Sequence, residues 1–103
     1  MEDILTKIVA AKKLEVENFK KNENEASLAK YPLFNRTPYS LKNFILDEDK
    51  TGIIAEFKRK SPSKGIIKDK ASPKLITRAY FENGASALSV LTDFSFFGGS
   101  VED

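Results

Sequence analysis

The stretch IIAEFKRKSPSKG, residues 53–65, decides the fold that we expect for this chain. It begins as a short apolar strand and ends in a loop of small residues and lysines. Side chains alternate along a strand, so Ile54, Glu56 and Lys58 share one face. Apolar residues at the start of both faces predict a strand buried on two sides in a parallel sheet. The acid and the base come at its carboxyl end, where α/β sheets and barrels place their chemistry.

The residues before this strand predict helices. Apolar side chains at helical spacing indicate an amphipathic helix over residues 3–21, and residues 22–30 predict a turn with a short helical piece. Two prolines and three aromatic residues predict an extended segment over residues 31–39. Ser40 is a good N-cap for a helix that ends near Leu46, before a charged turn.

The residues after the strand complete a βαβ unit with parallel strands. Ser72 and Pro73 are the favoured cap and first-turn residues of a helix, and Asn83 with Gly84 predicts its end. The side chains that this helix is expected to bury are Leu75, Ile76, Ala79 and Tyr80. The expected strands cover residues 53–58 and 87–92, and the expected loops cover residues 59–71 and 94–100.

Composition limits the chemistry of the chain. Its 103 residues allow one small domain, and 17 basic against 15 acidic residues give a net charge of +2. This balance does not predict nucleic acid or an anionic membrane as a partner. Histidine and cysteine are absent, which removes Cys/His zinc sites, thiol nucleophiles and imidazole catalysis. Carboxylates, lysines and hydroxyls remain to carry any chemistry, and no metal site is expected. The predicted location is cytoplasmic.

One βαβ unit leaves two open strand edges and cannot bury both faces of its sheet. We therefore expect the chain to be the opening portion of a larger α/β fold. Residues 1–50 are interpreted as an N-terminal helical extension and residues 51–103 as the first βαβ unit. Such a portion is expected to self-associate, by edge pairing or by exchange of elements between copies.

Two groups of residues could act on an anionic ligand. In a site of reduced dielectric, Glu56 would keep Lys58 ionised and hold its ammonium in place; the alternative is a plain salt bridge at the sheet end. The segment SPSKG, residues 61–65, combines hydroxyls, a cation and a glycine, as anion-binding loops do; the alternative is a solvated basic loop. The aromatic loop at residues 94–100 predicts a pocket wall or a partner surface; the alternative is a segment out of place because the chain that would cover it is missing. A nucleic-acid patch, which lacks interleaved aromatic residues, would comprise Lys58, Arg59, Lys60, Lys64, Lys68 and Lys70.

The segments IIAEFKRKSPSKG, NGASALSVLTD and FFGGS occur in this order, and together they resemble the N-terminal part of the indole-3-glycerol phosphate synthase family. The helices ILTKIVAAKK and SLKNFIL also resemble the N-terminal extension of that family. The resemblance implies a (β/α)8 TIM barrel with extra N-terminal helices, here truncated after the second strand. It implies a lyase of tryptophan biosynthesis that closes the indole ring of 1-(2-carboxyphenylamino)-1-deoxyribulose 5-phosphate with loss of CO2 and water. This small anionic phosphate is the implied substrate, and no cofactor is required.

The resemblance also implies roles for individual residues. Lys58 matches the lysine that contacts the anthranilate carboxylate, and Glu56 matches the acid that orients catalytic lysines. Ser61 matches a loop hydroxyl beside the carboxylate, and Pro62 shapes that turn. The residues that match apolar and aromatic walls of the substrate site are Leu91 and Phe97.

The family's general-acid lysine, its second catalytic acid and its phosphate site lie on later strands that this chain does not contain. Barrel sites draw residues from several strands. We therefore expect the 103-residue chain by itself to have no synthase activity.

Overall fold

A computed structural model describes residues 3–68 and 70–103. The chain divides after Tyr39 into two units, each of which is described by itself. The predicted division into a helical extension over residues 1–50 and a βαβ unit over residues 51–103 stays a prediction. Asp69, the acid between Lys68 and Lys70 of the nucleic-acid patch considered above, lies outside the described residues. Within the described part of the chain, no helix combines the length and the apolar character needed to cross a bilayer.

The first unit contains the long helix α1 (Ile4–Asn22) and the single-turn helix α2 (Glu25–Leu28), which confirms both predictions. Asp3 caps α1, because its Oδ1 accepts a hydrogen bond from the Thr6 amide over 2.8 Å. This bond to the charged carboxylate lowers the pKa of Asp3. Residues 31–35 form turns, so the prediction of an extended segment over 31–39 is wrong for its first half. Backbone hydrogen bonds within the turns, such as Phe34 to Tyr31, override the extended preference of the prolines.

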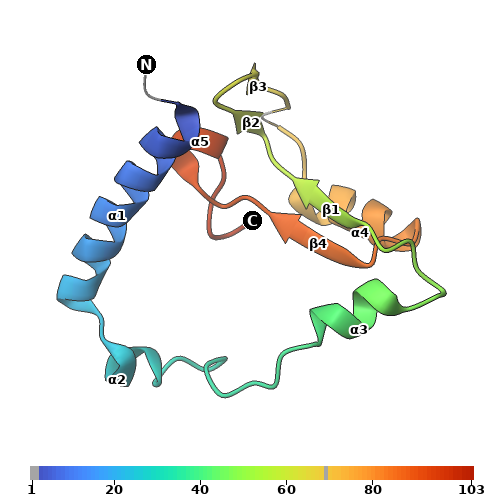
Figure 1. Cartoon of the computed structure of the whole chain (residues 1–103), viewed down its shortest axis with the longest axis horizontal. Coiled ribbons are helices and arrows are strands. Elements are labelled where there is room, and N and C mark those ends of the chain that lie inside the picture. Colours follow the sequence, from blue (N-terminus) through green and yellow to red (C-terminus); the bar gives the residue numbers. More distant parts are fainter. Residues whose placement is uncertain (1–2, 69) are drawn as a thin grey trace. The chain divides into compact units, whose positions relative to one another are not determined.

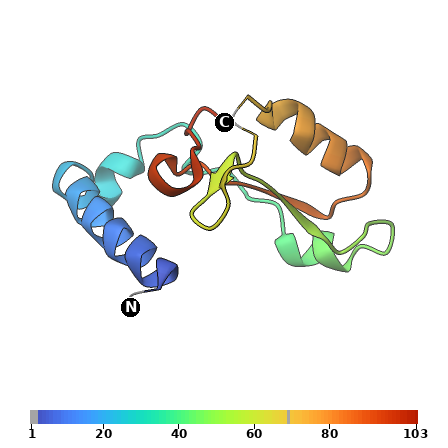
Figure 2. The ribbon, with the colours of Figure 1, turned by 90° about the horizontal axis from the view of Figure 1, so that it is seen from above.

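The second unit is built on two parallel strands, β1 (Ile54–Phe57) and β4 (Ala87–Val90). The predicted α/β class with a parallel sheet is therefore confirmed. The helix α4 (Pro73–Glu82) connects them and contacts both strands, as Figure 1 shows. The helix α3 (Leu41–Leu46), which contacts β4, lies on the other side of the strand pair from α4 in Figure 2. Ser40 and Ser72 cap these helices with their side chains, as predicted.

Burial in this sheet is one-sided. Phe57 is only 3% exposed and Ala55, on the same face, is half-buried, whereas Ile54 and Glu56 on the opposite face are exposed. The expectation of a strand buried on two faces is therefore wrong for the described chain, because α4 packs along one face. Leu75 and Ala79 of α4 are also exposed, contrary to prediction, while Ile76 and Tyr80 are half-buried.

The carboxyl ends of β1 and β4 point toward the same end of the sheet, where a hairpin and a short helix lie (Figure 1). The hairpin consists of β2 (Lys60–Ser61) and β3 (Gly65–Ile66), so the loop predicted for residues 59–71 contains regular structure. Gly65, at φ 64°, lets the chain turn back into this hairpin. The helix α5 (Phe94–Phe97) contacts β2 and replaces the loop predicted from residue 94. Asp93 caps α5 by accepting the Phe96 amide over 2.8 Å, and Gly98 ends it.

Candidate functional site

Glu56 lies on the open face of the sheet, next to Ser89 of β4. The two residues are register partners in the parallel ladder, and such partners project to the same face. Ser89 Oγ donates a hydrogen bond to Glu56 Oε2 over 2.9 Å. The carboxylate is exposed and held on one side, so its other oxygen can accept a proton or a hydrogen bond from a ligand.

Lys58 follows β1 directly and is exposed. The Arg59 guanidinium, one residue further on, lies 5.3 Å from the ring centroid of the buried Phe57. The expected grouping of the Lys58 side chain with Glu56 on one face stays a prediction. Within residues 3–68 and 70–103, Lys58 and Glu56 form no ion pair with each other. The alternative of a plain salt bridge between the two is therefore wrong in this structure.

Ser61 and Pro62 lie in the hairpin. Ser61 is buried, and its Oγ accepts a hydrogen bond from the Lys64 amide over 3.2 Å. The Ser63 hydroxyl lies 3.4 Å from Ser61 Oγ. Pro62, at the tip, is exposed. The hydroxyl of Ser61 thus already has a structural role in closing the turn, and it can still donate its proton to a ligand.

Leu91 and Phe97 lie at the carboxyl end of β4, Leu91 just after the strand and Phe97 on α5, and both are half-buried. Leu91 continues the ladder by donating its amide to the Phe57 carbonyl over 3.1 Å. The carbonyl of Leu91 packs so closely on Gly99 that a Cβ there would lie 2.0 Å from it. The backbone after α5 therefore folds back onto the strand end. The predicted wall residues come from the same strand end, while their contact with substrate stays a prediction.

A second link at this end joins Arg59 to Asp103. Arg59 Nη2 donates to Asp103 Oδ1 over 2.9 Å, and Arg59 Nη1 contacts Asp103 Oδ2. This pairing lowers the pKa of the Asp103 carboxyl and raises the pKa of Arg59, because each charge is stabilised by the other. Arg59, one of the cations of the nucleic-acid patch considered above, is therefore paired with an acid of the same protein.

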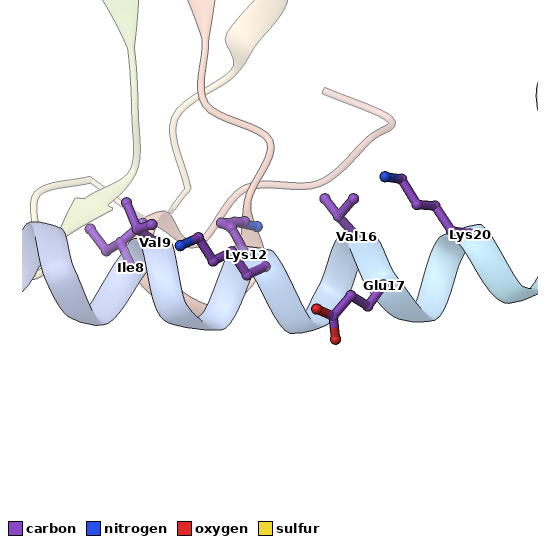
Figure 3. Close-up of a pocket in the computed structure, with 7 residues that line it drawn as sticks. Ile8, Val9, Lys12, Val16, Glu17 and Lys20 are labelled. Carbon is purple, nitrogen blue, oxygen red and sulfur yellow. The ribbon is translucent and has the colours of Figure 1, made fainter.

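No cluster of metal-binding side chains marks this region in the part of the chain that the structure describes. In the described chain, no group of three or more acidic side chains is arranged to hold a metal ion. A groove of about 390 Å³ runs along α1 (Figure 3), where Val9, Lys12, Val16 and Lys20 line it with other residues of that helix. None of the predicted site residues lines this groove.

Comparison with known proteins matches residues 5–103 to the family model described as indole-3-glycerol phosphate synthase. The chain belongs to the indole-3-glycerol phosphate synthase family. A relative of that name from Bacteroides thetaiotaomicron is 48% identical over 105 residues, covering 100% of this chain and 39% of the relative. A relative from Bordetella pertussis is 40% identical and covers 100% of this chain and 40% of its own length. One from Prochlorococcus marinus is 44% identical over 101 residues, with coverage of 97% and 34%. The chain thus spans between 34% and 40% of the length of these synthases.

Two contacts near the carboxyl ends of β1 and β4 were not predicted from the sequence. Ser89 is the one polar residue within the strand pattern ALSV, and pairing the two strands in register would have placed it beside Glu56. The pairing of Arg59 with Asp103 has no local signal, because the two residues are 44 positions apart.

Proposed function

We propose that the full-length protein containing this chain is an indole-3-glycerol phosphate synthase. It closes the indole ring of 1-(2-carboxyphenylamino)-1-deoxyribulose 5-phosphate, with loss of CO2 and water, in tryptophan biosynthesis. In this proposal β1 and β4 are the first two strands of a (β/α)8 barrel. The observation that supports it best is the position of Glu56 and Lys58 at the carboxyl end of a parallel strand, in a chain that belongs to this family.

Lys58 binds the carboxylate of the substrate in this proposal. An ammonium meeting an anion in a water-poor site contributes more than it would in bulk water, because the local dielectric is lower. Glu56, held from one side by Ser89, uses its second oxygen to orient a catalytic ammonium. The acid and the base are therefore proposed as the catalytic residues of this strand.

The other four residues complete the proposed substrate site. Ser61 donates its hydroxyl proton beside the carboxylate while it accepts the Lys64 amide. Pro62 restricts the conformation of the hairpin tip. Leu91 and Phe97 form apolar walls against the aromatic ring of the substrate, which suits their half-buried positions at the end of β4.

Steady-state kinetics of the purified full-length protein test this function, with product formation followed by indole fluorescence. Lys58→Ala is expected to lower kcat/KM by at least roughly thirtyfold, since losing the charged partner of a desolvated anion costs about 2 kcal/mol or more. Glu56→Gln, which keeps the shape but removes the charge, is also expected to lower kcat. Lys74→Ala, at an exposed lysine of α4, is the matched control and should behave as the unmodified protein.

Two results would contradict the proposal. One is the failure of the unmodified full-length protein to form indole-3-glycerol phosphate. The other is a Lys58→Ala variant with the same kcat/KM as the Lys74→Ala control.

We further propose that the 103-residue chain alone is inactive and self-associates. Its described sheet has two strands and leaves Ile53, Ile54 and Leu88 exposed, and open edges with exposed apolar faces favour pairing between copies. Sedimentation of the purified 103-residue chain should show a dimer or a larger species, and synthase assays should give no product above a blank. A cooperatively unfolding monomer, or measurable product, would disprove this second proposal.

A further inference from the structure

The ion pair between Arg59 and Asp103 differs from an ordinary surface pair. It is bidentate, and the two side chains are only 17% and 11% exposed. By contrast, the pair between Arg78 and Glu82 on α4 has side chains that are 72% and 58% exposed. A planar guanidinium that makes two bonds to a carboxylate fixes orientation as well as distance. The Arg59 pair can therefore hold two segments in one arrangement.

Each partner of this pair is anchored in its own segment. The Arg59 guanidinium lies over the ring of the buried Phe57. The backbone carbonyl of Arg59 accepts hydrogen bonds from the amides of Ile67 and Lys68 over 2.7 and 3.0 Å. The Asp103 carboxylate also accepts the Ser100 amide over 3.0 Å. The ion pair thus connects the junction between β1 and β2 to the turn that follows α5.

Lys58 lies between Phe57, the last residue of β1, and Arg59. Burial holds Phe57 in place, and the ion pair with Asp103 holds Arg59. Within the described part of the chain, the Lys58 side chain has no hydrogen bond or ion pair of its own. Its placement therefore depends on the backbone that these two neighbours hold.

We propose that Asp103 is a positioning residue, which acts through Arg59 to hold the end of β1 so that Lys58 presents its ammonium to the anionic group of the substrate. Asp103 also occupies the guanidinium of Arg59, so that the substrate meets Lys58 and not a competing neighbouring cation. The identity of that substrate rests on the function proposed above, whereas the effect on the backbone does not.

The test uses the full-length protein with Asp103→Ala, Asp103→Asn and Asp103→Glu, and Glu82→Ala as the matched control for losing an ion pair. Asp103→Ala is expected to raise KM about tenfold with a smaller change in kcat, because a displaced cation weakens substrate binding. Asp103→Glu, which can still pair with Arg59, should recover part of this loss. Asp103→Asn keeps the side-chain volume, so it reports on the charge if the alanine variant does not fold.

Hydrogen exchange of the amides at residues 58–61 provides a readout that needs no activity. Exchange there should be faster in Asp103→Ala and Asp103→Asn than in the unmodified protein or in Glu82→Ala. Unchanged exchange would overturn the inference, and so would faster exchange with unchanged KM. If the unmodified protein makes no product, the proposed function fails separately, and the exchange result still decides whether Asp103 holds this segment.

Discussion

Ser89 Oγ donates a hydrogen bond to Glu56 Oε2 over 2.9 Å, from one parallel strand to the next. The bond restricts the rotation of an otherwise exposed carboxylate. It thereby links the orientation of the candidate catalytic acid to a residue 33 positions later in the chain.

Removing this hydroxyl should impair the proposed activity. Ser89→Ala in the full-length protein is expected to lower kcat/KM roughly tenfold, because a hydrogen bond to a charged group contributes about 1.5 kcal/mol or more. Ser89→Thr keeps the hydroxyl and should retain most of the activity. Equal kinetics for the alanine variant and the unmodified protein would show that the bond does not orient Glu56.

Gly99 should tolerate no side chain, for reasons of space. A Cβ at this position would lie 2.0 Å from the Leu91 carbonyl oxygen and 2.7 Å from Thr92 Cα. Gly99→Ala is therefore expected to lower the free energy of unfolding by roughly 2 kcal/mol or more, measured by urea denaturation. Gly65→Ala is the comparison, because a Cβ there meets no atom within 4 Å and only the positive φ of 64° is unfavourable. Its cost should be near 1 kcal/mol, and equal losses for the two variants would be the contrary result.

The Arg59–Asp103 pair should make stability depend on acid pH. The folded protein holds the pKa of Asp103 below its ordinary value of 3.8. The pair therefore stabilises the folded state fully above that value, and the contribution is lost as the pH falls through the lower pKa of the folded state. The difference in unfolding free energy between the unmodified protein and Asp103→Asn should shrink over this range. Carboxyl groups shared by both proteins cancel in this comparison, and a difference that grows on acidification would contradict the assignment.

Tyr31 should titrate at unusually high pH. The Glu23 carboxylate accepts hydrogen bonds from Ser27 Oγ over 2.5 Å and from the Tyr31 hydroxyl over 3.0 Å. The bond to Glu23 stabilises the neutral phenol and the carboxylate charge opposes the phenolate, so the pKa of Tyr31 lies above 10.0. Glu23→Gln should lower this pKa in an alkaline ultraviolet titration, with Tyr31→Phe used to identify the signal. Glu25→Gln, at a neighbouring exposed acid, should leave the titration unchanged.

Local signals were enough to predict most of the helices and both parallel strands. Capping residues such as Ser40 and Ser72 act within one turn of their helix, so they can be recognised without knowledge of the fold. The hairpin of β2 and β3 was missed because two-residue strands carry almost no periodic pattern. The helix α5 was missed because its aromatic residues and the two glycines that follow it were interpreted as one loop, although Asp93 is a good N-cap.

The sequence by itself determined the element order, the alternation that is expected to group Glu56 with Lys58, and the family to which the chain belongs. These features depend on neighbouring residues and on ordered motifs, both of which can be read along the chain. Only the tertiary structure decided that Ser89 holds Glu56, that Asp103 engages Arg59, and that the backbone at Gly99 packs on Leu91. Each of these contacts joins residues that are not neighbours in the sequence, and the register and packing that bring them together are properties of the folded chain.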